Sequence, residues 1–166
     1  MSFYYIWKRM KDLKGKTVLI TGGVSGIGKL MGKLVLEKGS NLIILDINPT
    51  NLKTTIAEFS ALGKVSGYRV DVSNPEEVSK TASLIKKEQD EVDVLINNAG
   101  IVVGKYFHEH SIPDIEKTIS INTIAPMYVT LEFLPQMMKR NSGHICNIAS
   151  SAGLISNSKM SVYAAS

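Results

Sequence analysis

The sequence predicts an α/β fold, a doubly wound parallel sheet covered by helices on both faces. Two observations lead to this prediction: short apolar runs alternate with helix-length segments, and most of these runs are apolar throughout. Strands buried on both faces have this composition. The 166 residues, of which 44% are hydrophobic and 20% charged, fit one globular domain with a sizeable core.

Five apolar runs are predicted to form the strands of this sheet. Each is short, and helix-length segments separate most of them, as expected when crossover helices connect neighbouring parallel strands. The predicted strands are Thr17–Thr21, Asn41–Leu45, Val65–Val70, Val92–Ile96 and His144–Ala149.

Apolar residues at helical spacing mark three connecting helices. The first is predicted between the first two strands and ends at Gly39, since glycine is favoured just after a helix C-terminus. The third has a well-marked start, with Asn74 as its cap, Pro75 at its first position and Glu77 completing a capping box. The apolar positions are Ile27, Leu30, Met31, Leu34 and Val35 in the first helix, Leu52, Ile56 and Phe59 in the second, and Val78, Ala82 and Ile85 in the third.

A longer helical pattern runs from Ser111, a predicted cap, to about Arg140. Pro126 lies inside it and is expected to break or kink the helix, because proline lacks a backbone N–H. Asn122 shares a face with apolar residues, where its amide has up to four hydrogen-bonding positions to satisfy. We therefore expect Asn122 either to brace the backbone or to reach a functional site.

The net charge of +4 is concentrated at the start of the chain. Residues 1–16 hold five basic residues and one aspartate, whereas the remaining 150 residues carry as many acidic as basic side chains. A nucleic-acid-binding protein needs a basic surface over its body, so this class is excluded. The chain thus divides into a basic, aromatic segment over residues 1–14 and one folded domain over residues 15–166.

The first segment suggests peripheral contact with an anionic membrane surface, because aromatic and apolar residues at 3–7 precede its positive charges. The alternative is a short helix that packs on the domain or on a partner. No apolar run approaches the roughly 20 residues that span a bilayer.

A single cysteine, Cys146, excludes an internal disulfide framework and is predicted to be an inert core thiol. We expect a soluble, cytoplasmic protein without a metal site, since His108 and His110 lie in a predicted loop without cysteine support.

A glycine-rich turn follows the first predicted strand and opens the first helix. Residues 21–28 read T-G-G-V-S-G-I-G, and small residues here let backbone N–H groups approach a pyrophosphate at the helix N-terminus. Asp46 ends the second strand, 18 residues after Gly28, where a carboxylate can accept both hydroxyls of an adenosine ribose. The alternatives are a simple tight turn and a solvated aspartate. Together the two features favour a dinucleotide site.

Polar residues also follow the fourth and fifth predicted strands. Asn97–Gly100 reads N-N-A-G, and Ser150 and Ser151 come after the fifth strand, with Tyr163 13 residues beyond Ser150. The carboxyl ends of parallel strands form the ligand-binding edge of open α/β sheets. Alone, each of these groups would be an ordinary turn or loop.

Together these motifs resemble the classical short-chain dehydrogenases/reductases. The resemblance covers residues 15–166 in order. It implies a Rossmann sheet, a nicotinamide cofactor and hydride transfer between an alcohol and a carbonyl. The matching motifs are T-G-x-x-x-G-I-G at 21–28, D-V at 71–72, N-N-A-G at 97–100, Asn122, N-I-A-S-S-A-G at 147–153 and Tyr163.

The resemblance implies a role for each site residue. Tyr163 would be the catalytic acid/base, Ser150 would hydrogen-bond the substrate oxygen and Asn122 would hold a proton-relay water. NAD is expected in preference to NADP, because Asp46 would repel a 2′-phosphate. The expected cofactor-binding residues are Thr21, Gly22, Ser25, Gly26, Ile27, Gly28, Asp46, Asp71, Val72, Asn98, Ala99 and Gly100.

Within the family, Leu45–Asn48, Phe133–Pro135 and Ser142–Ile145 are most similar to the branch of 17β-hydroxysteroid and retinol dehydrogenases. That branch implies a lipophilic alcohol or carbonyl substrate, and the family implies a homodimer or homotetramer packed through the helix that contains Asn122. In the family a lysine follows the tyrosine by four residues, one position beyond Ser166. We therefore expect a fold truncated before its C-terminal strand or strands. Without that lysine, the 166 residues alone are expected to show no dehydrogenase activity.

Two alternatives stay open. One is a truncated family member that binds a dinucleotide or a partner chain without catalysis. The other is the sugar-nucleotide epimerases and dehydratases, which share the fold but usually show a different glycine spacing.

Overall fold

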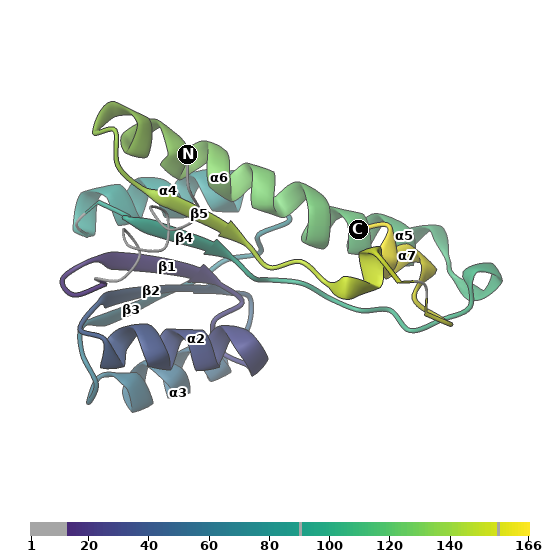
Figure 1. Cartoon of the computed structure of the whole chain (residues 1–166), viewed down its shortest axis with the longest axis horizontal. Helices are drawn as coiled ribbons and strands as arrows, with labels where there is room; N and C mark the ends of the chain where they lie inside the picture. Colours follow the sequence, from purple (N-terminus) through teal and green to yellow (C-terminus); the bar gives the residue numbers. More distant parts are fainter. Residues whose placement is uncertain (1–12, 90, 156) are drawn as a thin grey trace.

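Strands and helices alternate along the chain in the computed structural model, which describes residues 13–89, 91–155 and 157–166 (Figure 1). The strands are β1 (Thr17–Thr21), β2 (Asn41–Asp46), β3 (Val65–Arg69), β4 (Val94–Asn97) and β5 (His144–Asn147). The α-helices are α2 (Gly26–Glu37), α3 (Pro49–Phe59), α4 (Pro75–Glu88), α5 (Ile112–Ile119), α6 (Ala125–Lys139) and α7 (Ser161–Ala164). Three short turns join them, the 3-10 helices η1 (Phe107–Glu109) and η3 (Ser151–Gly153) and the π-helical turn η2 (Ser120–Ile124).

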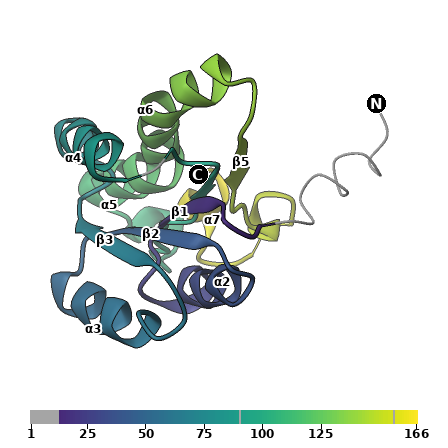
Figure 2. The ribbon, with the colours of Figure 1, turned by 90° about the vertical axis from the view of Figure 1, so that its left-hand side faces the viewer.

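The five strands form one parallel sheet in the order β3-β2-β1-β4-β5. The order reverses between β1 and β4, because β2 and β3 extend the sheet on one side of β1 and β4 and β5 on the other. Helices α2 and α3 cover one face of the sheet and α4 and α6 the other (Figure 2). The predicted doubly wound sheet is therefore confirmed, with the ligand-binding switch point between β1 and β4.

Each face of the sheet has its own hydrophobic core. On one face Val18, Ile20 and Leu42 pack against α2 and α3, and on the other Leu19, Ile43 and Leu95 pack against α4 and α6. Gly32 brings α2 close to the sheet, since a Cβ at this position would lie 3.1 Å from Leu42 Cδ2 and 3.2 Å from Phe59 Cε2. The strands β1 and β2 are buried almost throughout, as their uniform apolar composition predicts.

The edge strand β5 differs from this prediction. It ends at Asn147, two residues before the predicted end, and most of its residues are exposed. Cys146 is exposed as well, so the prediction of a core thiol is wrong. The physical reason is its place in the sheet: among the described residues, β4 is the only strand that pairs with β5.

The helix starts follow the capping residues, with one correction. Asn74 caps α4, and its side-chain oxygen accepts hydrogen bonds from the backbone N–H groups of Glu76 and Glu77 at 3.0 and 3.2 Å. Glu77 does not complete the predicted capping box, because its carboxylate binds the Asp71 N–H and the Arg69 side chain. Its bonds run instead to the segment that enters from β3.

The long helical pattern from Ser111 to Arg140 is interrupted, as Pro126 predicts. Ser111 caps α5 in a capping box with Asp114. The helix passes into the π turn η2, where the Ala125 N–H donates to the Ser120 carbonyl, and Pro126 lies in the first turn of α6. The N–H that proline lacks thus falls directly after the π turn, where the regular α-helical hydrogen bonding is already interrupted.

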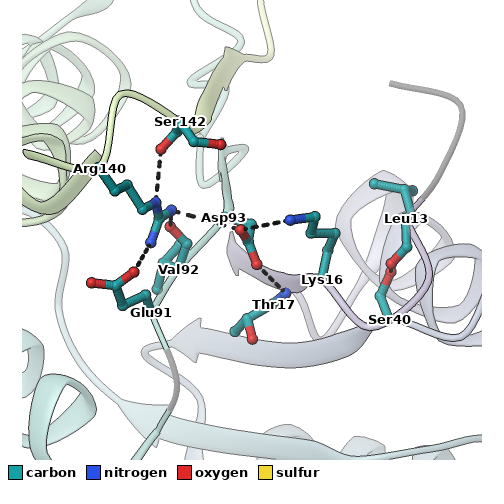
Figure 3. Close-up of polar contacts among 9 residues, drawn as sticks. All are labelled: Leu13, Lys16, Thr17, Ser40, Glu91, Val92, Asp93, Arg140 and Ser142. Carbon is teal, nitrogen blue, oxygen red and sulfur yellow. Dashed lines mark hydrogen bonds and ion pairs between the residues drawn. The ribbon is translucent and has the colours of Figure 1, made fainter. Parts of the chain in front are cut away.

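The amino edge of the sheet is tied together by charged side chains (Figure 3). Asp93, just before β4, accepts a hydrogen bond from the Thr17 N–H at 3.0 Å and pairs with Lys16 at 3.3 Å. Arg140, just after α6, pairs with Glu91 at 2.8 Å and donates to the carbonyls of Val92 and Ser142. This network, the amino-edge network, connects the entries to β1, β4 and β5.

The predicted membrane contact rests on residues at 3–7, which lie outside the described residues. In the part of the chain that the structure describes, no helix is long and apolar enough to cross a bilayer.

Candidate active site

A cleft of about 1460 Å³ runs along the carboxyl edge of the sheet. Its wall contains segments that follow all five strands: the glycine-rich turn after β1, then residues 45–47, 70–72, 97–102 and 147–151. The turn η2 and the helix α7 close the side next to β5. Every predicted site residue except Thr21 lines this cleft.

The glycine-rich turn has no room for side chains on its inner side. A Cβ at Gly28 would lie 2.2 Å from the Gly22 carbonyl oxygen, and one at Gly22, where φ is +67°, would lie 2.9 Å from Ala99 Cα. At Gly26 a Cβ would meet no atom within 4 Å. The turn therefore lies tight against the residues after β4 and leaves open space at Gly26.

The helix α2 begins at this turn without a capping side chain. Ser25 stands at the cap position but makes no side-chain hydrogen bond there, and the first turn has no acidic residue. The first N–H groups of a helix have no intrahelical partners and carry partial positive charge. An anionic group such as a pyrophosphate fits these properties.

Thr21 and Asn98 join the glycine-rich turn to the N-N-A-G segment. Thr21 Oγ1 accepts hydrogen bonds from the N–H groups of Asn98 and Ala99, both at 3.0 Å. Asn98 Nδ2 donates in return to the carbonyls of Thr21 and Gly22 at 3.0 and 3.1 Å. Thr21, expected among the cofactor-binding residues, is buried behind the cleft and supports its wall.

Asp46 lies at the end of β2 in the wall of the cleft and is 9% exposed. Its Oδ1 accepts from the Asn48 N–H at 2.9 Å, and its Oδ2 is 3.4 Å from the Val24 N–H. These bonds fix the carboxylate next to the glycine-rich turn. Each oxygen has two lone pairs, so both retain capacity to accept a further hydrogen bond.

Asn122 both braces the backbone and lines the cleft, so the two expectations for this residue hold together. Its Oδ1 accepts from the Ile101 N–H at 2.9 Å, and its Nδ2 donates to the Ile101 carbonyl at 3.0 Å and to Ser166 Oγ at 2.8 Å. The side chain thereby holds the segment after N-N-A-G and the end of α7 against η2.

Ser150 and Tyr163 reach the same cleft from the far side of the sheet. Ser150 caps η3, where its Oγ accepts from the Ala152 N–H at 3.1 Å. Tyr163 lies on the four-residue helix α7, which is tied to η2 by a hydrogen bond of 3.0 Å from Thr123 Oγ1 to the Ser166 carbonyl.

Asn97 and Asn147 belong to motifs that the sequence analysis singled out, but the contact between them was not predicted. Asn97 Nδ2 donates to Asn147 Oδ1 at 2.8 Å and to Thr130 Oγ1 at 3.2 Å, which links β4, β5 and α6. Asn97 Oδ1 is buried without a partner among the described residues. The one available signal was the asparagine that ends both strands, but only the pairing of β4 with β5 brings the two residues opposite each other.

The loop between β4 and α5 is anchored outside the cleft. Lys105 Nζ lies 2.8 Å from Asp114 Oδ2, which also accepts hydrogen bonds from Ser111. The Lys105 hydrogen bond, supported by those from Ser111, lowers the pKa of Asp114 below its ordinary value of 3.8. His108 in this loop stacks on Tyr106, with ring centroids 5.9 Å apart. Across the described ranges, no three histidine, cysteine or acidic side chains cluster as metal ligands would.

Comparisons with known proteins agree on one family. The family model described as short chain dehydrogenase matches residues 16–166. Estradiol 17-beta-dehydrogenase 11 of Pongo abelii is 42% identical over 153 residues, which cover 92% of this chain and 51% of the relative. Epidermal retinol dehydrogenase 2 of Mus musculus is 39% identical over 168 residues, which cover 100% and 54%. The chain thus spans about half the length of these curated relatives.

Solved structures show the same fold. A short chain dehydrogenase/reductase from Burkholderia phymatum in complex with NAD has a TM-score of 0.89 and 32% identity, covering 94% of this chain and 56% of that one. A metagenomic short-chain oxidoreductase in complex with NADP has a TM-score of 0.87 and 26% identity, covering 93% and 71%. The chain therefore belongs to the short chain dehydrogenase family, and its curated relatives include a 17β-hydroxysteroid dehydrogenase and a retinol dehydrogenase.

Proposed function

We propose that this chain carries the dinucleotide-binding region of an NAD-dependent dehydrogenase, together with the side chains that act on its substrate. The enzyme would transfer a hydride between a lipophilic alcohol or carbonyl and nicotinamide. The observation that carries this proposal is that Ser150, Tyr163 and Asn122 line the same cleft as the glycine-rich turn and Asp46. The residues proposed for binding and those proposed for proton transfer thus line one cleft. The names of the relatives and the NAD and NADP complexes of similar structures support the same chemistry.

The residues of the cleft fit a nicotinamide dinucleotide. The uncapped start of α2 at Gly26 would hold the pyrophosphate, and Asp46 would accept hydrogen bonds from the adenosine ribose. Asp71 and Val72 would line the adenine end, and Asn98–Gly100 the middle of the site. Bound there, the nicotinamide supplies the hydride acceptor.

Tyr163 and Ser150 would handle the substrate oxygen. Removal of a hydride from an alcohol carbon requires the hydroxyl proton to leave, and Tyr163 would take it on its phenolate oxygen and so become the neutral phenol. The Ser150 hydroxyl already accepts a hydrogen bond from the Ala152 N–H, so its own proton is available to the substrate oxygen. Asn122 would keep Ile101 and α7 in place around them and would hold the proton-relay water.

Turnover by substituted forms of a version continued past Ser166, through the lysine expected by the resemblance, tests these roles. Tyr163→Phe is expected to remove nearly all NADH formation and Ser150→Ala most of it, while NAD affinity stays within about twofold. Ser151→Ala removes a hydroxyl of the same wall that is exposed and makes no hydrogen bond with the described residues, and serves as the control. Full turnover by Tyr163→Phe would refute the mechanism, and NAD binding without any turnover would support the non-catalytic alternative.

The choice of NAD follows from charge. A 2′-phosphate on the adenosine ribose would face the carboxylate of Asp46, and neither Ser25 in the turn nor Ile47 after the strand supplies a positive charge. Calorimetric titration with NAD and NADP tests this choice. NAD is expected to bind more tightly, and Asp46→Ala to reduce the difference. Tighter binding of NADP, or a ratio unchanged by Asp46→Ala, would overturn the assignment.

A lipophilic substrate is supported by the apolar side of the cleft, where Val102, Met127, Leu131 and Ile148 line the wall. A steroid alcohol and retinol are expected to give higher kcat/KM values than a polyol. Equal or higher kcat/KM values for the polyol would contradict this substrate class.

Assembly and membrane contact stay predictions. A homodimer or homotetramer would show as a doubled or quadrupled mass in light scattering. Peripheral membrane contact would show as sedimentation with anionic vesicles that is lost when residues 1–12 are removed.

A further inference from the structure

The side chain of Asp71 is held on one oxygen and open on the other. Its Oδ1 accepts hydrogen bonds from the backbone N–H and the hydroxyl of Ser73, at 2.9 and 2.6 Å. Its Oδ2 accepts none from the described residues, and Asp71 lines the cleft. The geometry thus leaves one carboxylate oxygen available to a donor in the cleft.

Glu77 holds the backbone of the same residue. Its Oε2 accepts from the Asp71 N–H at 3.0 Å and from Arg69 Nη1 at 2.9 Å. Glu77 is in the first turn of α4, so these bonds fasten the segment between β3 and α4 from the helix side. The Asn74 N–H donates to the Asp71 carbonyl at 3.0 Å, which closes this segment into a tight turn. Asp71 is therefore fixed at its N–H, its carbonyl and one carboxylate oxygen.

The strand order places this turn at the adenine end of the cleft. Asp71 follows β3, whereas Ser150 follows β5, and these two strands form opposite edges of the sheet (Figure 2). If the reaction takes place beside β5, as in the proposed function, the adenine half of the dinucleotide lies toward β2 and β3. A carboxylate accepts hydrogen bonds and cannot donate them. The Asp71 carboxylate therefore suits the amino group of adenine and disfavours a base with a carbonyl oxygen at the same place.

We propose that Glu77 is a positioning residue for adenine selection, which acts by holding the Asp71 backbone so that the free carboxylate oxygen meets the adenine amino group. This inference rests on the proposed function of the cleft. It adds a residue that touches no part of the cofactor, since Glu77 does not line the cleft.

The test compares two dinucleotides that differ in this amino group alone. NAD carries adenine, and deamino-NAD carries hypoxanthine, which has a carbonyl oxygen in place of the amine. Dissociation constants for both, measured by calorimetry on the same protein sample, give a selectivity ratio. Because both ligands report on the same folded molecules, partial unfolding of a variant leaves this ratio unchanged. We expect the unsubstituted protein to prefer NAD by at least about tenfold.

Three variants separate positioning from general stability. Glu77→Ala is expected to lower the selectivity ratio at least about threefold. Glu77→Gln, which keeps an acceptor for the Asp71 N–H, is expected to retain most of the ratio. Glu76→Ala is the matched control, because Glu76 is in the same helical turn and its carboxylate makes no hydrogen bond or ion pair within the described ranges. In an Asp71→Ala background, Glu77→Ala is expected to have no further effect on the ratio.

Two sets of results would overturn this inference. If Glu77→Ala weakens the binding of NAD and deamino-NAD equally, or if Glu76→Ala lowers the ratio as much, Glu77 contributes only to stability. If the unsubstituted protein binds both dinucleotides equally, Asp71 does not select the amino group. Both outcomes leave the proposed function intact, whereas a protein that binds neither dinucleotide refutes both proposals.

Discussion

The carboxyl ends and the amino ends of the parallel strands are held together by different chemistry. At the carboxyl ends of β1 and β4, neutral side chains bind the backbone of the neighbouring segment, as Thr21 does with Asn98 and Asn122 with Ile101. The ion pair of Arg69 with Glu77 lies farther along this side, at the end of β3. At the amino edge, the contacts are ion pairs and charged hydrogen bonds centred on Asp93 and Arg140 (Figure 3).

This difference separates binding from structural support. Among the described residues that line the cleft, Asp46 and Asp71 are the ones with charged side chains, so the field that a dinucleotide meets there comes from few groups. The neutral hydrogen bonds of Thr21, Asn98 and Asn122 hold the rest of this wall without adding further negative charge to it. The charged groups that tie β1, β4 and β5 together lie at the amino ends of these strands, and none of them lines the cleft.

The largest effect is expected from Gly28→Ala, which breaks the contact between the glycine-rich turn and Asn98. The added Cβ would lie 2.2 Å from the Gly22 carbonyl oxygen and 2.5 Å from Asn98 Nδ2, so the turn must move. Calorimetric titration should detect no NAD binding. Gly104→Ala is the control, because a Cβ there meets no atom within 4 Å. An NAD affinity of Gly28→Ala within twofold of the original would show that the tight turn is not required.

Thr21→Val tests the comparison at the two ends of one strand, β1. It keeps the shape of the side chain but leaves the N–H groups of Asn98 and Ala99 without an acceptor, at about 1–3 kcal/mol each. We expect urea denaturation to show a loss of about 2–6 kcal/mol in the free energy of unfolding, together with weaker NAD binding. Thr17→Val is the matched variant at the amino end of β1, because Thr17 is a buried residue whose hydroxyl makes no hydrogen bond with the described residues. A loss as large for Thr17→Val would count against the comparison.

Arg140→Ala tests the amino edge. It removes the pair with Glu91 and leaves the carbonyls of Val92 and Ser142 without this donor, so we expect the free energy of unfolding to fall by about 2 kcal/mol. The NAD affinity of the folded protein should stay within twofold. Lys139→Ala, an exposed neighbour, should change neither quantity. A large loss of NAD affinity in Arg140→Ala would show that the two edges are coupled.

The smallest effect is expected from protonation of Asp114 at low pH. This residue of α5 pairs with Lys105 at 2.8 Å, and neither of the two lines the cleft. The pKa of Asp114 is lower in the folded state, so the carboxylate stabilises the fold above about pH 4 and this contribution is lost as the pH falls further. The difference in melting temperature between the unsubstituted protein and Asp114→Asn should therefore shrink below pH 3.8. Glu116→Gln on the same helix should show no such trend. A difference that grows on acidification would reverse the assigned sign.

Local patterns predicted most of the fold and much of the cleft. The strand β1 has the predicted bounds, and the glycine-rich turn and Asp46 lie where a strand-turn-helix unit places them, because each depends on neighbouring residues. Cys146 was misjudged, since an apolar run reads alike in a central strand and at an edge. The hydrogen bonds of Glu77 were also not predicted from the sequence. A glutamate at this position can complete a capping box or bind the Asp71 N–H, and only the tertiary structure decides between the two.

The contacts between Asn97 and Asn147 and between Asn122 and Ile101 join residues 50 and 21 positions apart. Such pairs follow from strand order and from the path of the chain after each strand. A single sequence contains the residues but not their distances, so it predicted Asn122 as a site residue without its partner.

The π turn η2 makes the number of residues between α5 and α6 as important for the orientation of α6 as the identity of those residues. One residue contributes about 100° of rotation to an α-helix, and a π turn contains an additional residue. Deletion of one residue from Ser120–Ile124 would restore a regular α-helical path and turn α6 about its axis by roughly that angle. Val129, Phe133 and Met137, which now face the sheet, would then point elsewhere. Insertions and deletions at Ser120–Ile124 are therefore far more disruptive than most substitutions. The number of residues in η2 fixes the rotation of α6, so that Asn122 can line the cleft while the apolar side chains of α6 face the sheet.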